Sequence, residues 1–187
     1  MAGPFEVFSV ATRVASRRSP GSAPPFGVWL VSKDGRQVRA RGAFPMTPDR
    51  ALGTSPDLDV LIVPGGVADA VEGDDEVTGW VRRLSSSTEV VASVCTGAFV
   101  LAAAGLLDGL TATTHWEDAA DLSARYPAVT VDPDRRWIDH GPVATSAGIS
   151  AGIDLALHLV ERFESEDLAR ATARQMDYRW EDTTGRR

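Results

Sequence analysis

The single cysteine of the chain, Cys95, lies where a nucleophile could be held. The residues before it, 89–94, are β-branched and apolar enough for a buried parallel strand, and residues 97–105 are typical of a short apolar helix. Ser93 and Gly97 lie two positions away on each side. This is the pattern of a nucleophile elbow, in which strand and helix pass too close for larger side chains. Because N–H groups at a helix start stabilise an anion, the pattern predicts a reactive thiolate; the alternative is a small buried hydrophobic cysteine.

Backbone donors for a developing negative charge are predicted beside this thiol. Residues 59–63 form the clearest buried strand of the sequence, and Pro64-Gly65-Gly66 stops it. The N–H groups of Gly66 and Thr96 both follow predicted strands, at the sheet edge where ligands bind in open α/β folds. The Thr96 side chain either orients a ligand or caps the helix.

Among the three histidines, His115 is the candidate catalytic base. It lies twenty residues after the cysteine and just beyond another predicted strand. The alternative is a structural histidine that a neighbouring hydrogen bond holds in place. Asp118 or Glu117 could complete a triad, although acidic residues at a helix start are also expected from the helix dipole. His158 is predicted to be a packed core group, and His140 a loop residue.

Composition limits the classes of protein. The 187 residues fit one domain, 1–187, with 43% hydrophobic and 24% charged residues, as in soluble globular proteins. A formal charge of 19 − 26 = −7 and the lack of a dense basic patch argue against nucleic acid as a direct partner. No run approaches the ~18 apolar residues of a membrane span, and no signal peptide opens the chain. We therefore expect a cytoplasmic protein with no membrane partner, no metal and no cofactor.

Predicted strands and helices alternate, which favours an α/β fold with a mostly parallel sheet covered on both faces. Residues 27–32 are predicted to be a strand, and 143–146 the last core strand. Residues 129–131 and 137–139 are predicted to pair with each other in a small antiparallel piece. Helices are expected near both ends of the chain, and no second domain is visible.

Five further blocks carry a resemblance to a known family. They are 3–8 (GPFEVF), 59–66 (DVLIVPGG), 103–109 (AAGLLDG), 112–116 (ATTHW) and 145–154 (TSAGISAGID). With the elbow, they make nearly the whole chain resemble the ThiJ/PfpI family of the class I glutamine amidotransferase-like superfamily. Two branches fit best: isocyanide hydratase-like enzymes and the sensor domains of AraC-type regulators.

The resemblance implies a flavodoxin-like three-layer sandwich, a homodimer, and a site made of Cys95, Thr96 and His115, with Gly65, Gly66 and Ile149 on the oxyanion and substrate side. It implies cysteine-dependent hydration of a small electrophile, from an isocyanide to an N-substituted formamide. The alternatives are a peptidase, amidase or glyoxalase-type enzyme, and a non-catalytic module that senses a ligand or an oxidant. Since no DNA-binding segment precedes Arg187, the stand-alone hydratase is favoured over the regulator.

The sequence departs from the family at its beginning. Family members open with a strand whose turn carries an acidic residue near the thiol, three positions before the Gly3-Pro4 block in the hydratase-like branch. Here that position would be residue zero. The strand would lie between those at 27–32 and 58–63, so we expect a gap there and weak stability. The hypothesis is that Met1 is an internal methionine of a protein about fifteen residues longer.

Overall fold

A four-stranded sheet in the order β5-β6-β10-β9 forms the centre of the molecule. The computed structural model describes residues 2–66 and 71–180. The strands are β5 (Val60–Val63), β6 (Val90–Val94), β10 (Val143–Ser146) and β9 (Trp137–Asp139). β5, β6 and β10 are parallel, and β9 joins β10 in antiparallel register. The parallel strands end at one edge of the sheet, where β6 leads directly into Cys95.

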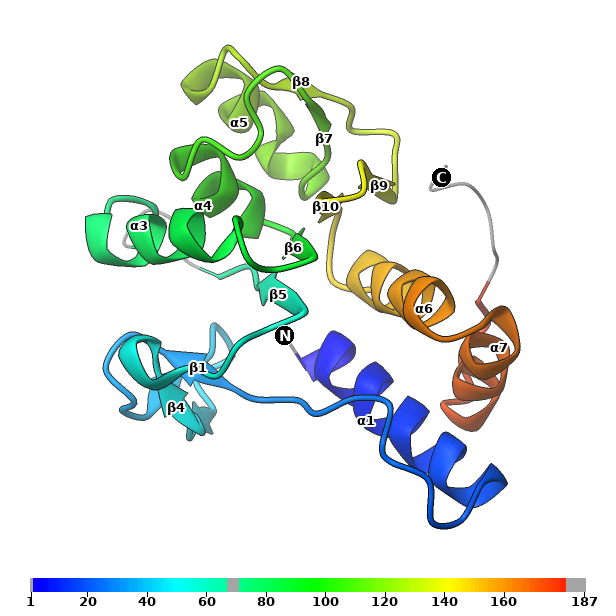
Figure 1. Cartoon of the computed structure of the whole chain (residues 1–187). Helices are drawn as coiled ribbons and strands as arrows, with labels where there is room; N and C mark the ends of the chain where they lie inside the picture. The colour runs from blue at the N-terminus through cyan, green and yellow to red at the C-terminus, as the bar shows by residue number, and fades with distance from the viewer. Residues whose placement is uncertain (1, 67–70, 181–187) are drawn as a thin grey trace.

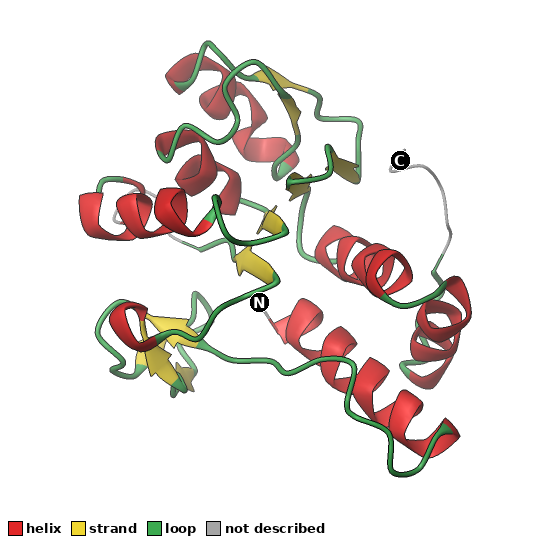
Figure 2. Ribbon diagram, in the orientation of Figure 1, coloured by secondary structure: helices red, strands yellow, loops and turns green. Residues whose placement is uncertain are grey.

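Helices cover both faces of this sheet, as the alternation of strands and helices predicts. On one side lie α1 (Ala2–Arg18), α6 (Ala151–Phe163) and α7 (Glu166–Gln175); on the other lie α3 (Asp75–Leu84), α4 (Gly97–Ala103) and α5 (Ala119–Arg125), as Figures 1 and 2 show. Strand β6 is buried throughout, with Val90 and Ala92 in the first core and Val91 in the second. Such a strand has no solvent face, which explains its continuous apolar sequence.

Residues 2–66 and 71–180 also form three two-stranded pieces and two short 3-10 helices. β1 (Val31–Ser32) pairs with β4 (Arg50–Ala51) in parallel, and β2 (Val38–Arg39) pairs with β3 (Pro45–Met46) as a hairpin. β7 (Thr111–Ala112) pairs in parallel with β8 (Thr130–Val131). The 3-10 helices are η1 (Leu52–Thr54) and η2 (Trp116–Asp118). Among the described residues, no helix is long and apolar enough to cross a membrane.

The predicted antiparallel pairing of 129–131 with 137–139 is wrong. Residues 130–131 pair with β7 and residues 137–139 pair with β10. β8 pairs with a strand that lies well before it in the sequence, which local pattern cannot specify, whereas β9 pairs with β10, the strand that directly follows it. The strand predicted at 27–32 is also shorter than expected, since only Val31 and Ser32 pair with another strand.

One edge of the central sheet is open within the described ranges. The Val90 N–H donates to the Asp59 carbonyl at 3.0 Å, and Val60 lies opposite Val90. In a parallel ladder this register turns the Leu61 amide toward β6 and the Val60 and Ile62 amides away from it. No hydrogen bond within residues 2–66 and 71–180 reaches those two outward amides, and β1 does not pair with β5. The gap expected between 27–32 and 58–63 is therefore present.

Candidate functional site

Cys95 occupies a strained backbone conformation between β6 and α4. Its φ is +56°, in the left-handed region that costs a non-glycine residue on the order of 1–3 kcal/mol. Hydrogen bonds hold it from both sides. Its N–H donates to the carbonyls of Ser146 and Ala147, each at 3.0 Å, and its carbonyl accepts the Thr114 hydroxyl at 2.9 Å. A residue held in strain by several partners is typical of a functional position.

Glycines permit the close approach of strand and helix that the elbow pattern predicts. A Cβ at Gly97 would overlap the Val63 carbonyl oxygen, and a Cβ at Gly65 would lie 2.7 Å from the Cβ of Cys95 and 3.1 Å from the Thr96 nitrogen. Real Cβ atoms essentially never show approaches like those to the Val63 oxygen and the Cys95 Cβ. Gly65 and Gly97 are thus required by the packing of β5, β6 and α4 around the thiol.

The Thr96 side chain does not cap the helix that it precedes. Its hydroxyl accepts the Gly66 N–H at 3.0 Å and donates to the Gly66 carbonyl at 3.1 Å, and it makes no capping bond to α4. The capping role considered from sequence is therefore wrong, and the hydroxyl cross-links α4 to the loop after β5, while a role in orienting a ligand stays a prediction. Because the Gly66 N–H is already bonded, the N–H of Thr96 is the better candidate to stabilise charge beside Cys95.

The balance of forces on the thiol differs from the simple expectation. Burial raises the pKa of Cys95 above its ordinary value, and the Asp118 carboxylate raises it further. The Thr96 N–H and hydroxyl oppose this rise, as the elbow pattern predicts, and so does the charge of Arg41. The net direction is upward, so the expectation of a thiolate favoured at rest is wrong. Any reaction in which this sulfur acts as a nucleophile would therefore have to remove the proton first.

His115 lies close to two carboxylates. Its Nδ1 is 3.6 Å from an oxygen of Glu117 and 3.6 Å from an oxygen of Asp118, and it accepts the Glu117 N–H at 3.4 Å. An accepting Nδ1 assigns the proton of the neutral ring to Nε2. On the other side the ring contacts Gly148, where a Cβ would lie 2.9 Å from Cδ2. Within the described part of the chain, no hydrogen bond joins His115 to the Cys95 thiol.

Apolar side chains are exposed near His115. Trp116 is 61% exposed, with its ring centroid 5.7 Å from that of His115, and Ile149, directly after Gly148, is 85% exposed. Trp116 lies in η2 directly after His115, and Ile149 directly follows the Gly148 that contacts the His115 ring, so both expose apolar surface in this part of the chain.

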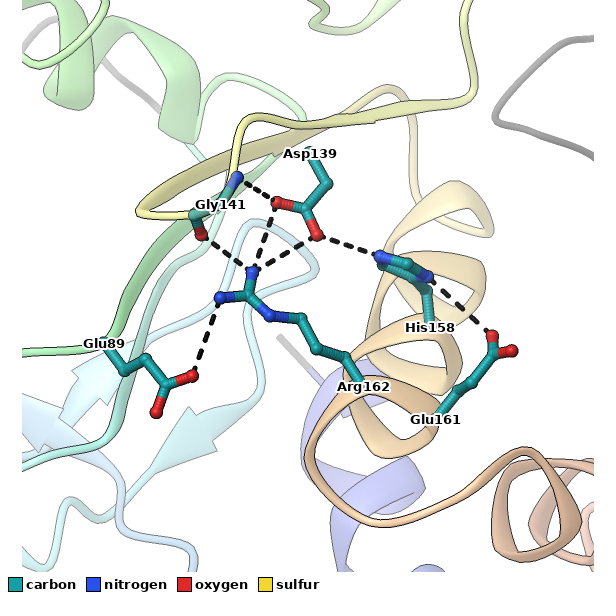
Figure 3. Close-up of polar contacts among 6 residues, drawn as sticks. All are labelled: Glu89, Asp139, Gly141, His158, Glu161 and Arg162. Carbon is teal, nitrogen blue, oxygen red and sulfur yellow. Dashed lines mark hydrogen bonds and ion pairs between the residues drawn. The ribbon is translucent and has the colours of Figure 1, made fainter.

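The other histidines lie away from Cys95. His158 hydrogen-bonds to Asp139 at 2.9 Å and stacks on Trp137 with centroids 4.2 Å apart, and Figure 3 shows Arg162 approaching the same carboxylate. This network fastens α6 to the turn between β9 and β10, in agreement with the structural role predicted for His158. His140 lies in that turn and contacts the Thr111 carbonyl at 2.8 Å.

Arg41 is the residue near the thiol that the sequence analysis missed. It lies in the turn between β2 and β3, far from Cys95 in sequence, and its charge reaches the thiol. No sequence pattern marked it, because residues 36–57 are irregular. Asp118 was considered only as a triad member for His115, yet its charge also acts directly on Cys95.

The geometry defines a class of protein: a three-layer α/β protein with a cysteine on a nucleophile elbow at the carboxyl edge of a parallel sheet. Residues 9–162 match the DJ-1/PfpI family, and the chain belongs to that family. Its fold is also that of a ThiJ/PfpI family protein from Pseudomonas syringae, with a TM-score of 0.80, 26% identity, and coverage of 98% of this chain and 70% of that one.

Two curated relatives differ in their roles. The isonitrile hydratase of Pseudomonas putida is 35% identical over 179 residues, which cover 95% of this chain and 72% of the relative. The HTH-type transcriptional regulator GbdR of Pseudomonas aeruginosa is 34% identical over 148 residues, 79% of this chain. The matched region spans only 40% of that regulator's length.

Proposed function

We propose that this chain hydrates isonitriles (isocyanides) to N-substituted formamides, with Cys95 as the nucleophile. The observation that carries the proposal is the strained, doubly anchored position of Cys95 beside the Thr96 N–H. The similarity to an isonitrile hydratase along nearly the whole chain supports the choice of reaction. Fold alone would not, because the family also contains regulators.

The first half of the proposed reaction adds the thiol across the terminal carbon of the isonitrile. The sulfur of Cys95 forms a bond to that carbon, and the proton that the thiol loses is delivered to the same carbon. The product is a thioimidate, and no other reactant is needed. His115 is the proposed carrier of this proton, and the carboxylates of Asp118 and Glu117, each 3.6 Å from its Nδ1, would attract the ring once it carries the proton. Because burial keeps Cys95 protonated at rest, proton removal and sulfur attack are coupled.

The second half releases the product with one water molecule. Water adds to the imidoyl carbon, the C–S bond breaks, and its electron pair returns to sulfur. One proton of the water ends on nitrogen and the other restores the thiol, which gives the N-substituted formamide. The Thr96 N–H would stabilise charge that develops next to the sulfur in both halves. Trp116 and Ile149 would contact the apolar group on the isonitrile nitrogen.

The test is formamide production from an aryl isocyanide by the chain and by four variants. Cys95→Ala and Cys95→Ser should abolish turnover. His115→Asn should lower kcat by about 100-fold, the usual contribution of a proton-transferring group. His140→Asn is the matched control, since His140 lies in a turn away from the thiol, and it should retain full activity. In D2O the formyl carbon should carry deuterium, since its hydrogen comes from an exchangeable proton.

Each contrary result points to a different rival. Turnover that survives Cys95→Ala would contradict the proposal outright. No turnover with folded protein, together with stoichiometric oxygen uptake by Cys95 in a peroxide titration, would favour the sensing module. Hydrolysis of amides that depends on both Cys95 and His115 would favour the peptidase or amidase.

A further inference from the structure

A buried carboxylate lies behind the loop that holds the elbow. Asp154, in the first turn of α6, is 5% exposed. One of its oxygens accepts both the Nε and an Nη of Arg136, the former at 2.8 Å, and the other accepts the Tyr178 hydroxyl at 2.9 Å. Tyr178 follows α7, so the three residues join the end of the described chain to α6 and to the start of β9.

This carboxylate connects to Cys95 through Arg136 and three backbone hydrogen bonds. The carbonyl of Arg136 accepts the Ala147 N–H at 2.8 Å, and the carbonyls of Ala147 and Ser146 accept the Cys95 N–H. The next residue, Gly148, packs against the His115 ring. Residues 146–148 therefore support both Cys95 and His115.

The charge state of the cluster makes it a rigid support. Burial and the hydrogen bond to Asp154 raise the pKa of Tyr178 to about 12, so its hydroxyl stays protonated and donates near neutral pH. Arg136 supplies the opposite charge, and both oxygens of the carboxylate are used. Hydrogen bonds to a buried charge are among the stronger ones in proteins. Without the Tyr178 hydroxyl, the Asp154 oxygen that accepts its hydrogen bond would lose that donor.

We propose that Arg136, Asp154 and Tyr178 are positioning residues that hold residues 146–148 in place and thereby keep Cys95 in its strained conformation. The catalytic part of this inference rests on the proposed function, in which Cys95 attacks the substrate. The positional part does not, because the Cys95 N–H and its two carbonyl partners are present with or without a substrate. Tyr178 makes the site dependent on how the segment after α7 packs.

Tyr178→Phe tests the inference with almost no change of volume. Arg162→Gln is the matched control, because Arg162 bonds Asp139 away from residues 146–148, on the same helix α6. Amide hydrogen exchange at Cys95 is measured by NMR in both variants, alongside kcat and KM for an aryl isocyanide. If Tyr178 merely stabilised the fold, the exchange rate of the Cys95 amide and kcat would change in the same way in both variants.

In Tyr178→Phe, we expect exchange of the Cys95 amide to accelerate and kcat to fall, each by about twofold to thirtyfold, with KM nearly unchanged. Arg162→Gln should leave both at the wild-type value after correction for global stability. The inference would be overturned if the Cys95 amide exchanged at the wild-type rate in Tyr178→Phe, or if its exchange accelerated equally in the two variants. Faster exchange in Tyr178→Phe alone, with no turnover in the wild type, would support the positional role and reject the proposed function.

Discussion

Substituting Gly97 by alanine tests the steric reasoning behind the elbow. The new Cβ would overlap the Val63 carbonyl oxygen and lie 3.0 Å from the Val63 carbonyl carbon. These atoms belong to the backbone of β5 and cannot swing aside, so overpacking should cost about 3 kcal/mol. Alanine recovers about 1 kcal/mol of helix propensity. The net loss is about 2 kcal/mol, which for a chain of this size lowers Tm by about 4–8 °C.

Gly79→Ala provides the matched control for this substitution. Gly79 lies within α3, and the nearest atom to its new Cβ is the end of the Arg83 side chain at 3.5 Å, an ordinary contact. Only the propensity gain remains, so Tm should rise by about 2–4 °C. Calorimetric melting of the two variants should thus give opposite signs. If Gly97→Ala melts at or above the wild type while Gly79→Ala rises, the close approach of β5 and α4 is not what requires the glycine.

Three further predictions concern charge and the open edge. Asp118→Asn should lower the pKa of Cys95 and speed its alkylation at pH 8, whereas Glu117→Gln should leave the rate unchanged; a slower rate in Asp118→Asn would contradict the assigned charge effect. Burial opposes ionisation of Asp139, but its hydrogen bonds and a nearby guanidinium together lower its pKa. Its contribution to stability is complete above about pH 4 and is lost as pH falls through the lowered pKa. Denaturation at pH 6 and pH 3 should therefore show a larger loss in wild type than in Asp139→Asn, and equal losses would reject this linkage. By NMR, the Ile62 amide should exchange at least about tenfold faster than the preceding amide, which faces β6; equal protection would mean that the edge is covered.

The elbow could be predicted from sequence because steric contacts restrict the residues on each side of Cys95 to small ones. Only small residues fit where β5, β6 and α4 meet, and Gly65 and Gly97 stand at those contacts. The buried strands were predictable for a similar reason, since strands covered on both faces have apolar sequences without alternation. In both cases the contacts that fix the structure also restrict which residue types can occupy the positions, and the sequence shows that restriction.

The parts that sequence reasoning missed depend on contacts between distant segments. The charge of Arg41, in the turn between β2 and β3, acts on Cys95 although the two residues are far apart in sequence, and nothing in the local sequence of Arg41 indicates this. The thiol's raised pKa follows from burial, which the helix-start argument did not weigh. The segment 27–32 has the composition of a strand, yet extended residues form a ladder only where a partner is present.

The outward edge of β5 has a consequence for how this protein behaves in concentrated solution. The amides of Val60 and Ile62 have no hydrogen-bond partner within the described part of the chain and lie between half-buried apolar side chains, so they are a template on which a strand of another molecule can add. The exposed carboxylates of Asp57 and Asp59 lie just before this strand, and the net charge of −7 keeps molecules apart. Salt screens that repulsion. Self-association should therefore increase with ionic strength as well as with protein concentration, and dilute, low-salt buffers should keep the chain dispersed.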